Sequence, residues 1–523
     1  MAQSAVVIDP EVLKAFAQDV TLLRKLRRGI EKESLRVSVE GQLSRCPHPA
    51  ALGSALTHPY ITTDFSEAQL ELITDVHDTT AACFEQLENV HRFVYQHLGE
   101  ELLWTTSMPC NLGSDSEIPI GQYGTSNIAT AKTVYRRGLG NRYGRLMQTI
   151  SGIHYNFSVP DEFWPPLAES RGAAADQDFQ TEAYFGLIRN FRRYSWLLIY
   201  LFGASPAICK SFVTNQPNRL QIFDEGSLYL PNATSLRMGR LGYQSAAQST
   251  LHISYNTLEE YMASMMEALT LSYPPYEAIG VKVADEYRQL NTALLQIENE
   301  FYGTIRPKRP IRSGERPLTA LRTRGVEYVE VRCLDLNPFL PVGIDSHEAR
   351  FIDLFLLYCL MAPSPNDSKL ESAIMGRNQL AVVEEGRDPE LELDAADGPV
   401  RLQEWADTLM EMLKPLVEML DTAHGCDHYS DTWEEQRRKI SDPALTPSAR
   451  ILEIMRRQQI PFFRFAMNQS IAHKGYFDEH PLRGGKLDKF RSLAEQSLAH
   501  QQQTERGDVV DFESFLKSYL AFE

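Results

Sequence analysis

Apolar residues recur at three- and four-residue steps along several long stretches of the chain, a period typical of amphipathic helices. These stretches cover about residues 12–26, 82–98, 182–200, 258–271, 449–466 and 487–520. A further apolar stripe is formed by Leu402, Trp405, Leu409, Leu413, Leu416 and Leu420. Each stripe must pack against another element to leave water, so the pattern predicts a helix-rich protein with a large core.

Four shorter stretches follow a two-residue period instead, which is typical of strands. They are Glu31-Lys32-Glu33, residues 64–71, His154-Tyr155-Asn156 and Glu330-Val331-Arg332. In each, acidic or polar side chains share one face, and most side chains of the other face are apolar. In the second stretch we expect Glu67, Gln69 and Glu71 to project together. The repeated arrangement predicts an antiparallel sheet with one polar, largely acidic wall.

The character of the chain changes near residue 380, and we predict a catalytic core over residues 1–380 and a helical annex over 381–523. Residues 383–397 are acidic and punctuated by glycine and proline, which indicates a surface loop. Residues 302–317 are basic and contain prolines, which indicates a second loop ahead of the strand that carries Glu330. The sequence contains no internal repeats.

Composition narrows the class of protein. The chain has 523 residues, of which 43% are hydrophobic and 23% charged, as in ordinary globular proteins. Its formal charge of −17 argues against a nucleic-acid or anionic-membrane surface. The seven cysteines are scattered without a C-x-x-C spacing, so reduced and mostly buried thiols are expected. We find no secretory signal and no run long enough to span a membrane, and we expect a cytoplasmic protein.

Carboxylates brought together on one wall would repel each other unless cations hold them. Hard divalent cations such as Mg²⁺ take oxygen ligands. The candidate ligands are Glu31, Glu33, Asp64, Glu71 and Glu330, with His154 completing one coordination shell. The alternative for any single acid is a solvated strand residue.

Positive charge is also needed where a transferred phosphoryl group becomes anionic. Arg332 shares a strand face with Glu330 and is the first candidate, although the two residues would equally suit an in-strand ion pair. Arg136 and Arg237 are further candidates. Residues 305–310 are basic and either reach nucleotide phosphates or form a solvated loop. The chain lacks a P-loop, a dinucleotide-binding glycine motif, H-E-x-x-H and G-x-S-x-G.

Several collinear motifs resemble those of proteobacterial glutamate-cysteine ligases. They lie at residues 28–37, 52–59, 61–68, 122–127, 146–157, 201–207, 295–300, 305–309 and 327–332. The resemblance implies a glutamine synthetase-like α+β fold with a curved, mostly antiparallel sheet surrounded by helices. It also implies a carbon-nitrogen ligase that uses ATP to join the side-chain carboxylate of glutamate to cysteine through γ-glutamyl phosphate. This is the first step of glutathione biosynthesis.

The same resemblance implies roles for individual residues. The six metal ligands would hold about two or three Mg²⁺ ions, with Mn²⁺ as an alternative, and Arg332, Glu330 and Arg136 would be catalytic. The substrate-binding set is Phe65, Tyr135, Leu139, Gln148, Ile150, Asn156, Arg237, Tyr243 and Tyr302, of which Phe65, Tyr135, Leu139, Gln148, Tyr243 and Tyr302 would form the cysteine pocket. A monomer inhibited by glutathione, without nucleic-acid or membrane partners, is expected. Two alternatives stay open: a sister enzyme that uses another amine, and a catalytically silent member that acts as a sensor.

Overall fold

The computed structural model describes residues 6–213, 218–241, 247–248, 251–312 and 315–521. Its helices are α1 (Pro10–Ala17), α2 (Thr80–Tyr95), α3 (Asn127–Tyr143), α4 (Trp164–Ser170), α5 (Gln177–Tyr194), α6 (Trp196–Phe202), α7 (Leu258–Thr270), α8 (Pro274–Ile279), α9 (Pro317–Arg324), α10 (Ser346–Met361), α11 (Lys369–Glu385), α12 (Leu402–His424), α13 (His428–Ser441), α14 (Pro447–Gln458), α15 (Phe462–Glu479), α16 (Gly484–Arg506) and α17 (Phe512–Leu520). Its strands are β1 (Arg27–Val37), β2 (Ile61–Thr63), β3 (Gln69–Ile73), β4 (Leu102–Leu103), β5 (Ile153–Ser158), β6 (Ala207–Cys209), β7 (Gln221–Ile222), β8 (Ser227–Tyr229), β9 (Lys282–Val283), β10 (Glu286–Tyr287), β11 (Ile305–Lys308), β12 (Tyr328–Leu334), β13 (Glu392–Ala395) and β14 (Gly398–Arg401). The predicted α+β class is confirmed.

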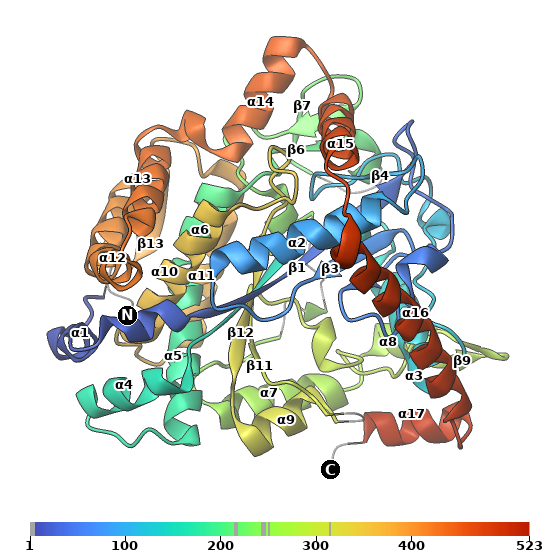
Figure 1. Ribbon diagram of the computed structural model, residues 1–523, viewed down its shortest axis with the longest axis horizontal. Coiled ribbons are helices and arrows are strands. Elements are labelled where there is room, and N and C mark those ends of the chain that lie inside the picture. Colours follow the sequence, from blue (N-terminus) through green and yellow to red (C-terminus); the bar gives the residue numbers. More distant parts are fainter. Residues whose placement is uncertain (1–5, 214–217, 242–246, 249–250, 313–314, 522–523) are drawn as a thin grey trace.

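A central antiparallel sheet organises the described part of the chain. Its strand order is β11-β12-β5-β1-β3-β2, and β4 pairs with β1 as the seventh strand. Helices surround this sheet (Figure 1). Helices α2 and α10 pack behind it, where Lys32, Leu72 and Tyr155 are buried. The opposite face carries the polar wall that the two-residue period predicts.

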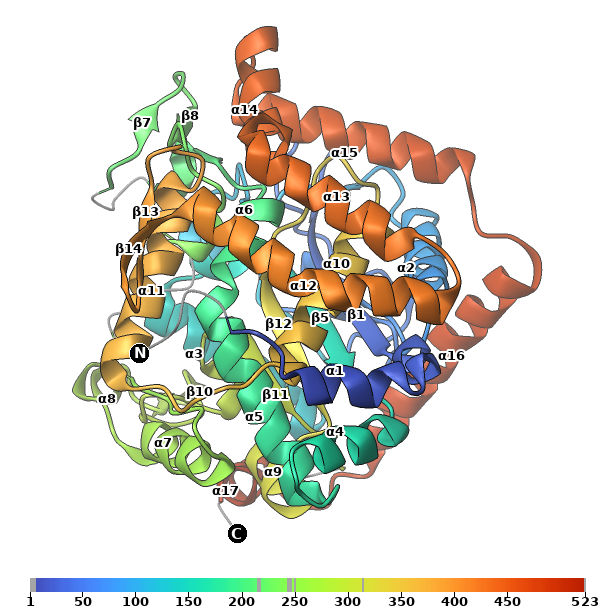
Figure 2. The same cartoon turned by 90° about the vertical axis from the view of Figure 1, so that its left-hand side faces the viewer.

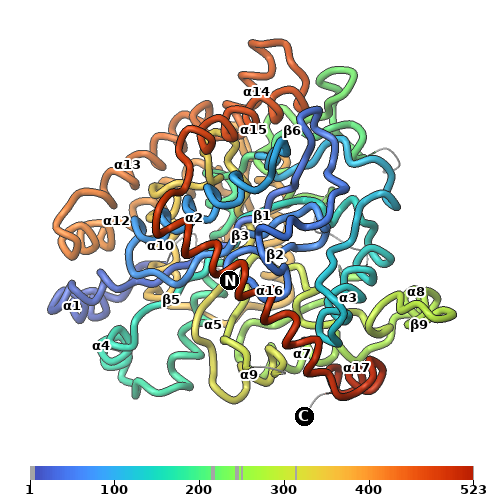
Figure 3. Tube along the Cα trace, turned by 45° about the vertical axis from the view of Figure 1, so that its right-hand side comes forward, coloured from blue at the N-terminus to red at the C-terminus, as the bar shows by residue number. Residues whose placement is uncertain are grey.

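The C-terminal helices share the core of the sheet. The α12 side chains of the predicted stripe, such as Trp405 and Leu413, belong to the same buried cluster as Ile30 and Tyr155. Helices α12 and α13 lie side by side over this region (Figure 2). Helix α16 then runs back across the molecule and leads to α17, which packs on α3 (Figure 3). Helix α17 therefore lies beside α3, which is more than 350 residues earlier in the sequence.

The stretches with a helical period do contain helices, but several of these stretches contain two separate helices. Residues 12–26 form α1 followed by a 3-10 helix, Val20–Lys25, which the Asp19 side chain caps by accepting from the Thr21 amide at 3.1 Å. Residues 182–200 span α5 and α6, 449–466 span α14 and α15, and 487–520 span α16 and α17. Within the described residues, every helix is too short or too polar to span a bilayer.

Three local predictions are wrong. Residues 383–397 contain the end of α11 and most of a hairpin of β13 and β14 rather than a surface loop. Residues 305–308 form strand β11, which tolerates Pro307 because it lies at an edge of the sheet. Residues 64–71 contain the turn between β2 and β3, so Glu67 does not project with Glu71. Its carboxylate instead accepts from the His48 amide at 2.8 Å and the Gln122 amide at 2.7 Å.

The prediction of reduced cysteines is also wrong for two of them. Cys110 and Cys209 form a disulfide, with their Cα atoms 5.5 Å apart. This separation lies in the range that a disulfide requires. The two residues are 99 positions apart in the sequence, so their spacing carried no signal. Cys83, Cys333 and Cys359 are buried free thiols, as expected.

Candidate active site

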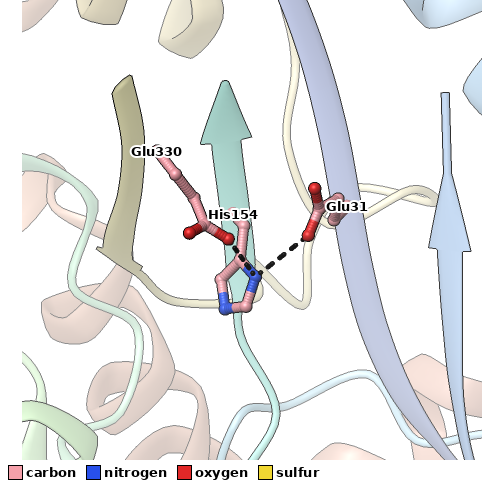
Figure 4. Close-up of side chains that lie close together, drawn as sticks. All are labelled: Glu31, His154 and Glu330. Atoms are coloured by element: carbon pink, nitrogen blue, oxygen red, sulfur yellow. Dashed lines mark hydrogen bonds and ion pairs between the residues drawn. The ribbon is translucent and has the colours of Figure 1, made fainter. Parts of the chain in front are cut away.

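Strand pairing brings the predicted metal ligands together. On β1, Glu31 lies opposite His154 of β5 and Glu33 lies opposite Glu71 of β3. The next strand, β12, places Glu330 beside the same histidine. His154 Nδ1 is 3.3 Å from Glu31 Oε2 and 3.5 Å from Glu330 Oε1 (Figure 4). One ligand atom from each of these three residues lies within 4.8 Å of the others, which suits a single cation.

The carboxylates of this cluster fall into two electrostatic groups. Burial, together with the Asp64 carboxylate, raises the pKa of Glu33 to about 8. Burial and the carboxylates of Glu31, Asp64 and Glu33 raise the pKa of Glu71 well above its ordinary value. Glu330 differs: burial opposes its charge, but nearby Lys308 and Arg332 hold its pKa well below the ordinary value. A site in which some buried carboxylates repel each other is one that divalent cations would stabilise.

Basic side chains surround Glu330. Lys308 Nζ lies 3.0 Å from Glu330 Oε2, and Arg332 Nη1 lies 3.1 Å from Glu330 Oε1. The buried Arg237 donates from Nη2 to the Arg332 carbonyl at 3.0 Å, and its Nη1 lies 3.6 Å from Asp335 Oδ1. The in-strand pair of Glu330 and Arg332 therefore forms, yet both side chains also line a cavity.

Arg136 contacts the backbone beside the carboxylate cluster. Its Nε donates to the carbonyl of Asp64, and its Nη2 donates to the carbonyl of Thr63 at 3.4 Å. Its guanidinium also lies over the ring of Tyr123, 4.5 Å from the centroid. These contacts hold the turn that presents Asp64 to the cluster.

Two cavities meet at this wall. The larger, of about 830 Å³, is lined by all six predicted metal ligands and by Phe65, Tyr135, Arg136, Leu139, Gln148, Ile150, Tyr302 and Arg332. The smaller, of about 600 Å³, is lined by Arg237 and also by His154, Tyr302 and Arg332. The two cavities therefore meet at His154, Tyr302 and Arg332. Residues 200 and more positions apart in sequence thus form one site.

Helix α3 and the loop before β11 form the aromatic part of the larger cavity. Gln148 Nε2 donates to the Tyr302 hydroxyl at 2.8 Å, which fixes the two side chains together. Behind them, the Tyr302 amide donates to Gln248 Oε1 at 3.0 Å. A fully buried pair, Arg142 Nη1 and Glu300 Oε1 at 2.8 Å, ties the end of α3 to the same loop. These contacts with residues outside the pocket therefore fix the positions of its wall residues.

Asn156 reaches the cluster through Glu31, because its amide donates to Glu31 Oε1 at 2.9 Å. Tyr243 lies outside the described residues.

Sequence reasoning missed some of the cavity wall. Lys308 belongs to the basic segment predicted either to reach nucleotide phosphates or to form a solvated loop; it lines the cavity from strand β11, beside Glu330. Lys132 of α3 was also missed. Burial, with Arg136 nearby, lowers its pKa to about 8, and its ammonium lies 5.1 Å from the Tyr123 ring centroid. Phe515 and Tyr519 line the cavity from the C-terminal helix, and nothing local pointed to them.

Comparisons with known proteins show which proteins this chain is similar to. A family model described as glutamate-cysteine ligase matches residues 13–382. The glutamate-cysteine ligase of Alcanivorax borkumensis is 50% identical over 514 residues, covering 96% of this chain and 97% of that protein. That of Azotobacter vinelandii is 52% identical over 505 residues, covering 96% and 95%. The crystal structure of the Francisella tularensis glutamate-cysteine ligase in complex with AMP has a TM-score of 0.89 at 36% identity, covering 95% of this chain and 97% of that one.

Proposed function

This chain belongs to the glutamate-cysteine ligase family, and we propose which of its residues carry out the ligation. The reaction is the ATP-dependent synthesis of γ-glutamylcysteine, the first step of glutathione biosynthesis. One cavity carries the assignment of residues. In it, a buried carboxylate cluster lies beside the basic side chains of Lys308 and Arg332 and beside an aromatic pocket. The AMP in the Francisella tularensis relative supports a nucleotide site.

The donor set fits Mg²⁺. Glu31, Glu33, Asp64, Glu71 and Glu330 offer hard oxygen ligands, and His154 stands among them with its pKa lowered, chiefly by burial. Glu31, His154 and Glu330 would hold one ion, and Glu33, Asp64 and Glu71 would hold about one or two more. Bound Mg²⁺ would neutralise the phosphates of ATP. The protonated state that burial favours for Glu33 would then give way to the ionised state.

Arg332 is placed to stabilise the phosphoryl group. Its guanidinium is about one-fifth exposed and lines both cavities, so it can contact an anion between them. Glutamate would present its side-chain carboxylate to the γ-phosphate of ATP there, forming γ-glutamyl phosphate. Glu330 holds Arg332 in place and also contributes to the metal cluster. Arg136 acts on the Asp64 turn, which makes it a positioning residue in this proposal.

The aromatic end of the larger cavity would bind cysteine. Phe65 and Leu139 offer an apolar surface to the thiol side chain, and the hydrogen-bonded pair of Gln148 and Tyr302 offers polar atoms to its other groups. Ile150, Asn156 and Arg237 would surround the glutamyl group. The cysteine amine would then displace phosphate from the acyl phosphate, within a cavity whose walls fix its direction of attack.

The cellular setting follows from the reaction. We expect a cytoplasmic monomer, because the described residues of the proposed site all come from one chain. Glutathione contains the γ-glutamylcysteine unit that the pocket holds, so it should compete with glutamate. Steady-state inhibition that glutamate does not relieve would contradict this.

The first experiment measures ADP release with Mg²⁺, glutamate and cysteine, with product mass read alongside. Cysteine is then replaced by 2-aminobutyrate, glycine or putrescine. Glu330→Gln should abolish turnover, because it removes a ligand and the partner of two cations. The matched control is Glu327→Gln, whose carboxylate is half exposed and pairs with Arg309. Turnover retained in Glu330→Gln, or lost equally in Glu327→Gln, would contradict the proposed site.

A further inference from the structure

The C-terminal helix forms part of the active-site wall although it lies beyond the family-model match, which ends at residue 382. Phe515 and Tyr519 of α17 line the same cavity as the metal cluster. Helices α16 and α17 reach this position by crossing the molecule (Figure 3). Helix α17 therefore supplies part of the cavity wall.

Contacts on two sides fix α17 in place. Asp508, just before the helix, accepts from the Asn127 amide at the start of α3 through Oδ2 at 2.6 Å. Leu516 packs in a cluster with Ala131 and Val134 of α3. At the other end of α17, Arg316 Nη1 donates to the Leu520 carbonyl at 3.1 Å. The position of α17 thus depends on both walls of the cavity.

Helix α3 shows which part of the cavity α17 occupies. Its cavity-lining residues run from Ile128, near Asp508, to Leu139, about 16 Å further along at the rise of an α-helix. Leu516 packs with Ala131 and Val134, and Tyr135 packs against the same cluster. Helix α17 therefore lies beside the first half of α3, and the Leu139 end of the cysteine pocket lies beyond it.

The side chains at this end suit a flat aromatic ligand. The rings of Phe515 and Tyr519 stack with centroids 5.6 Å apart and planes 15° apart, and both are half-buried. Arg316, which pairs with Glu298 at 2.8 Å, lines the same part of the wall. Aromatic rings beside guanidinium groups bind nucleobases by stacking, with little dependence on base identity.

We propose that Phe515 and Tyr519 hold the adenine base of ATP, an assignment that rests on the function proposed above. The phosphates would then extend past Lys308 toward the metal cluster, and cysteine would enter the other end. Helix α17 is thus a binding element of the nucleotide site. A helix that only braced α3 would instead affect the cysteine pocket.

The test compares Phe515→Ala and Tyr519→Ala with Tyr519→Phe, which keeps the ring, and with Phe512→Ala. Phe512 is the matched control because its ring packs edge-on against Tyr287, with centroids 4.9 Å apart. KM is measured for ATP, glutamate and cysteine, and binding of a non-hydrolysable ATP analogue is measured at equilibrium. The two alanine variants should raise the KM for ATP and the Kd of the analogue about tenfold or more, and leave the other two KM values within about twofold. Tyr519→Phe and Phe512→Ala should retain nucleotide affinity.

Other outcomes would overturn the assignment. An equal rise in the KM for cysteine, or a loss of analogue affinity in Phe512→Ala as large as in Tyr519→Ala, would show that α17 acts only through packing. Unchanged analogue affinity in both alanine variants, with circular dichroism confirming their fold, would overturn it directly. Failure of the wild-type protein to form γ-glutamylcysteine would count against the proposed function, whereas the analogue measurement tests α17 independently.

Discussion

Replacing Asp353 by alanine should destabilise the protein strongly, since this residue anchors two ligand-bearing strands from behind. Arg28 of β1 donates from Nε to Asp353 Oδ2 at 2.9 Å, and the Tyr155 hydroxyl of β5 donates to Asp353 Oδ1 at 2.8 Å. The Arg28 and Asp353 side chains are 2% and 0% exposed. Alanine would leave the guanidinium in a dry core without its partner. The same strands present Glu31 and His154 to the opposite face.

The size of the effect follows from this burial. Breaking a buried ion pair by removing one partner costs about 3–5 kcal/mol, because the remaining charge is uncompensated. Tyr155→Phe removes one hydrogen bond to a charged acceptor and should cost about 1.5–3 kcal/mol. The double variant Arg28→Met with Asp353→Leu removes both charges of this pair, so it should be more stable than Asp353→Ala alone.

Equilibrium urea unfolding, followed by tryptophan fluorescence and by circular dichroism, measures these differences, and agreement of the two probes tests for two-state behaviour. Glu11→Ala is the control. It breaks an ion pair with Lys14 whose side chains are 68% and 69% exposed, and should cost under about 0.5 kcal/mol. A cost below about 1 kcal/mol for Asp353→Ala, or a double variant less stable than the single one, would refute the reasoning.

Three further predictions concern the pocket, the pH dependence and the disulfide. Gln148→Leu removes the donor to the Tyr302 hydroxyl and should raise the KM for cysteine about tenfold with the KM for ATP unchanged; steady-state kinetics showing the reverse would contradict the pocket assignment. Burial lowers the pKa of His58 to about 4, while the unfolded chain has a pKa near about 6.5, so its stabilising contribution is complete above pH about 6.5 and is lost as pH falls toward 4. His58→Asn should flatten this dependence in urea midpoints measured between pH 7 and 4, and an unchanged slope would argue against it. Replacing Cys110 and Cys209 by alanine should cost up to about 4.7 kcal/mol, because the disulfide closes a loop with a sequence separation of 99 residues, and titration of the denatured wild-type protein should find only the five remaining thiols.

The polar wall of the sheet could be predicted from the sequence because the alternation of side chains along a strand is a local property. Glu31 and Glu33 share a face whatever their strand pairs with, and the same holds for Glu330 and Arg332. The collinear motifs added the fold and the reaction. Local reasoning failed where turns and edges intervene, as at Glu67 and in the segment that forms β11.

The sequence by itself thus determined the facing of the acidic side chains, the main helical stretches and the family. Only the tertiary structure decided that Glu330 lies beside His154, that Cys110 bonds to Cys209, and that Phe515 and Glu31 line the same cavity. These residues are about 100 to 480 positions apart, and no local period encodes their proximity. The raised pKa of Glu33 has the same origin, since it depends on burial and on a carboxylate from another strand. Side-chain direction is set by backbone geometry within a few residues, whereas partners are set by which surfaces the whole chain can bury together.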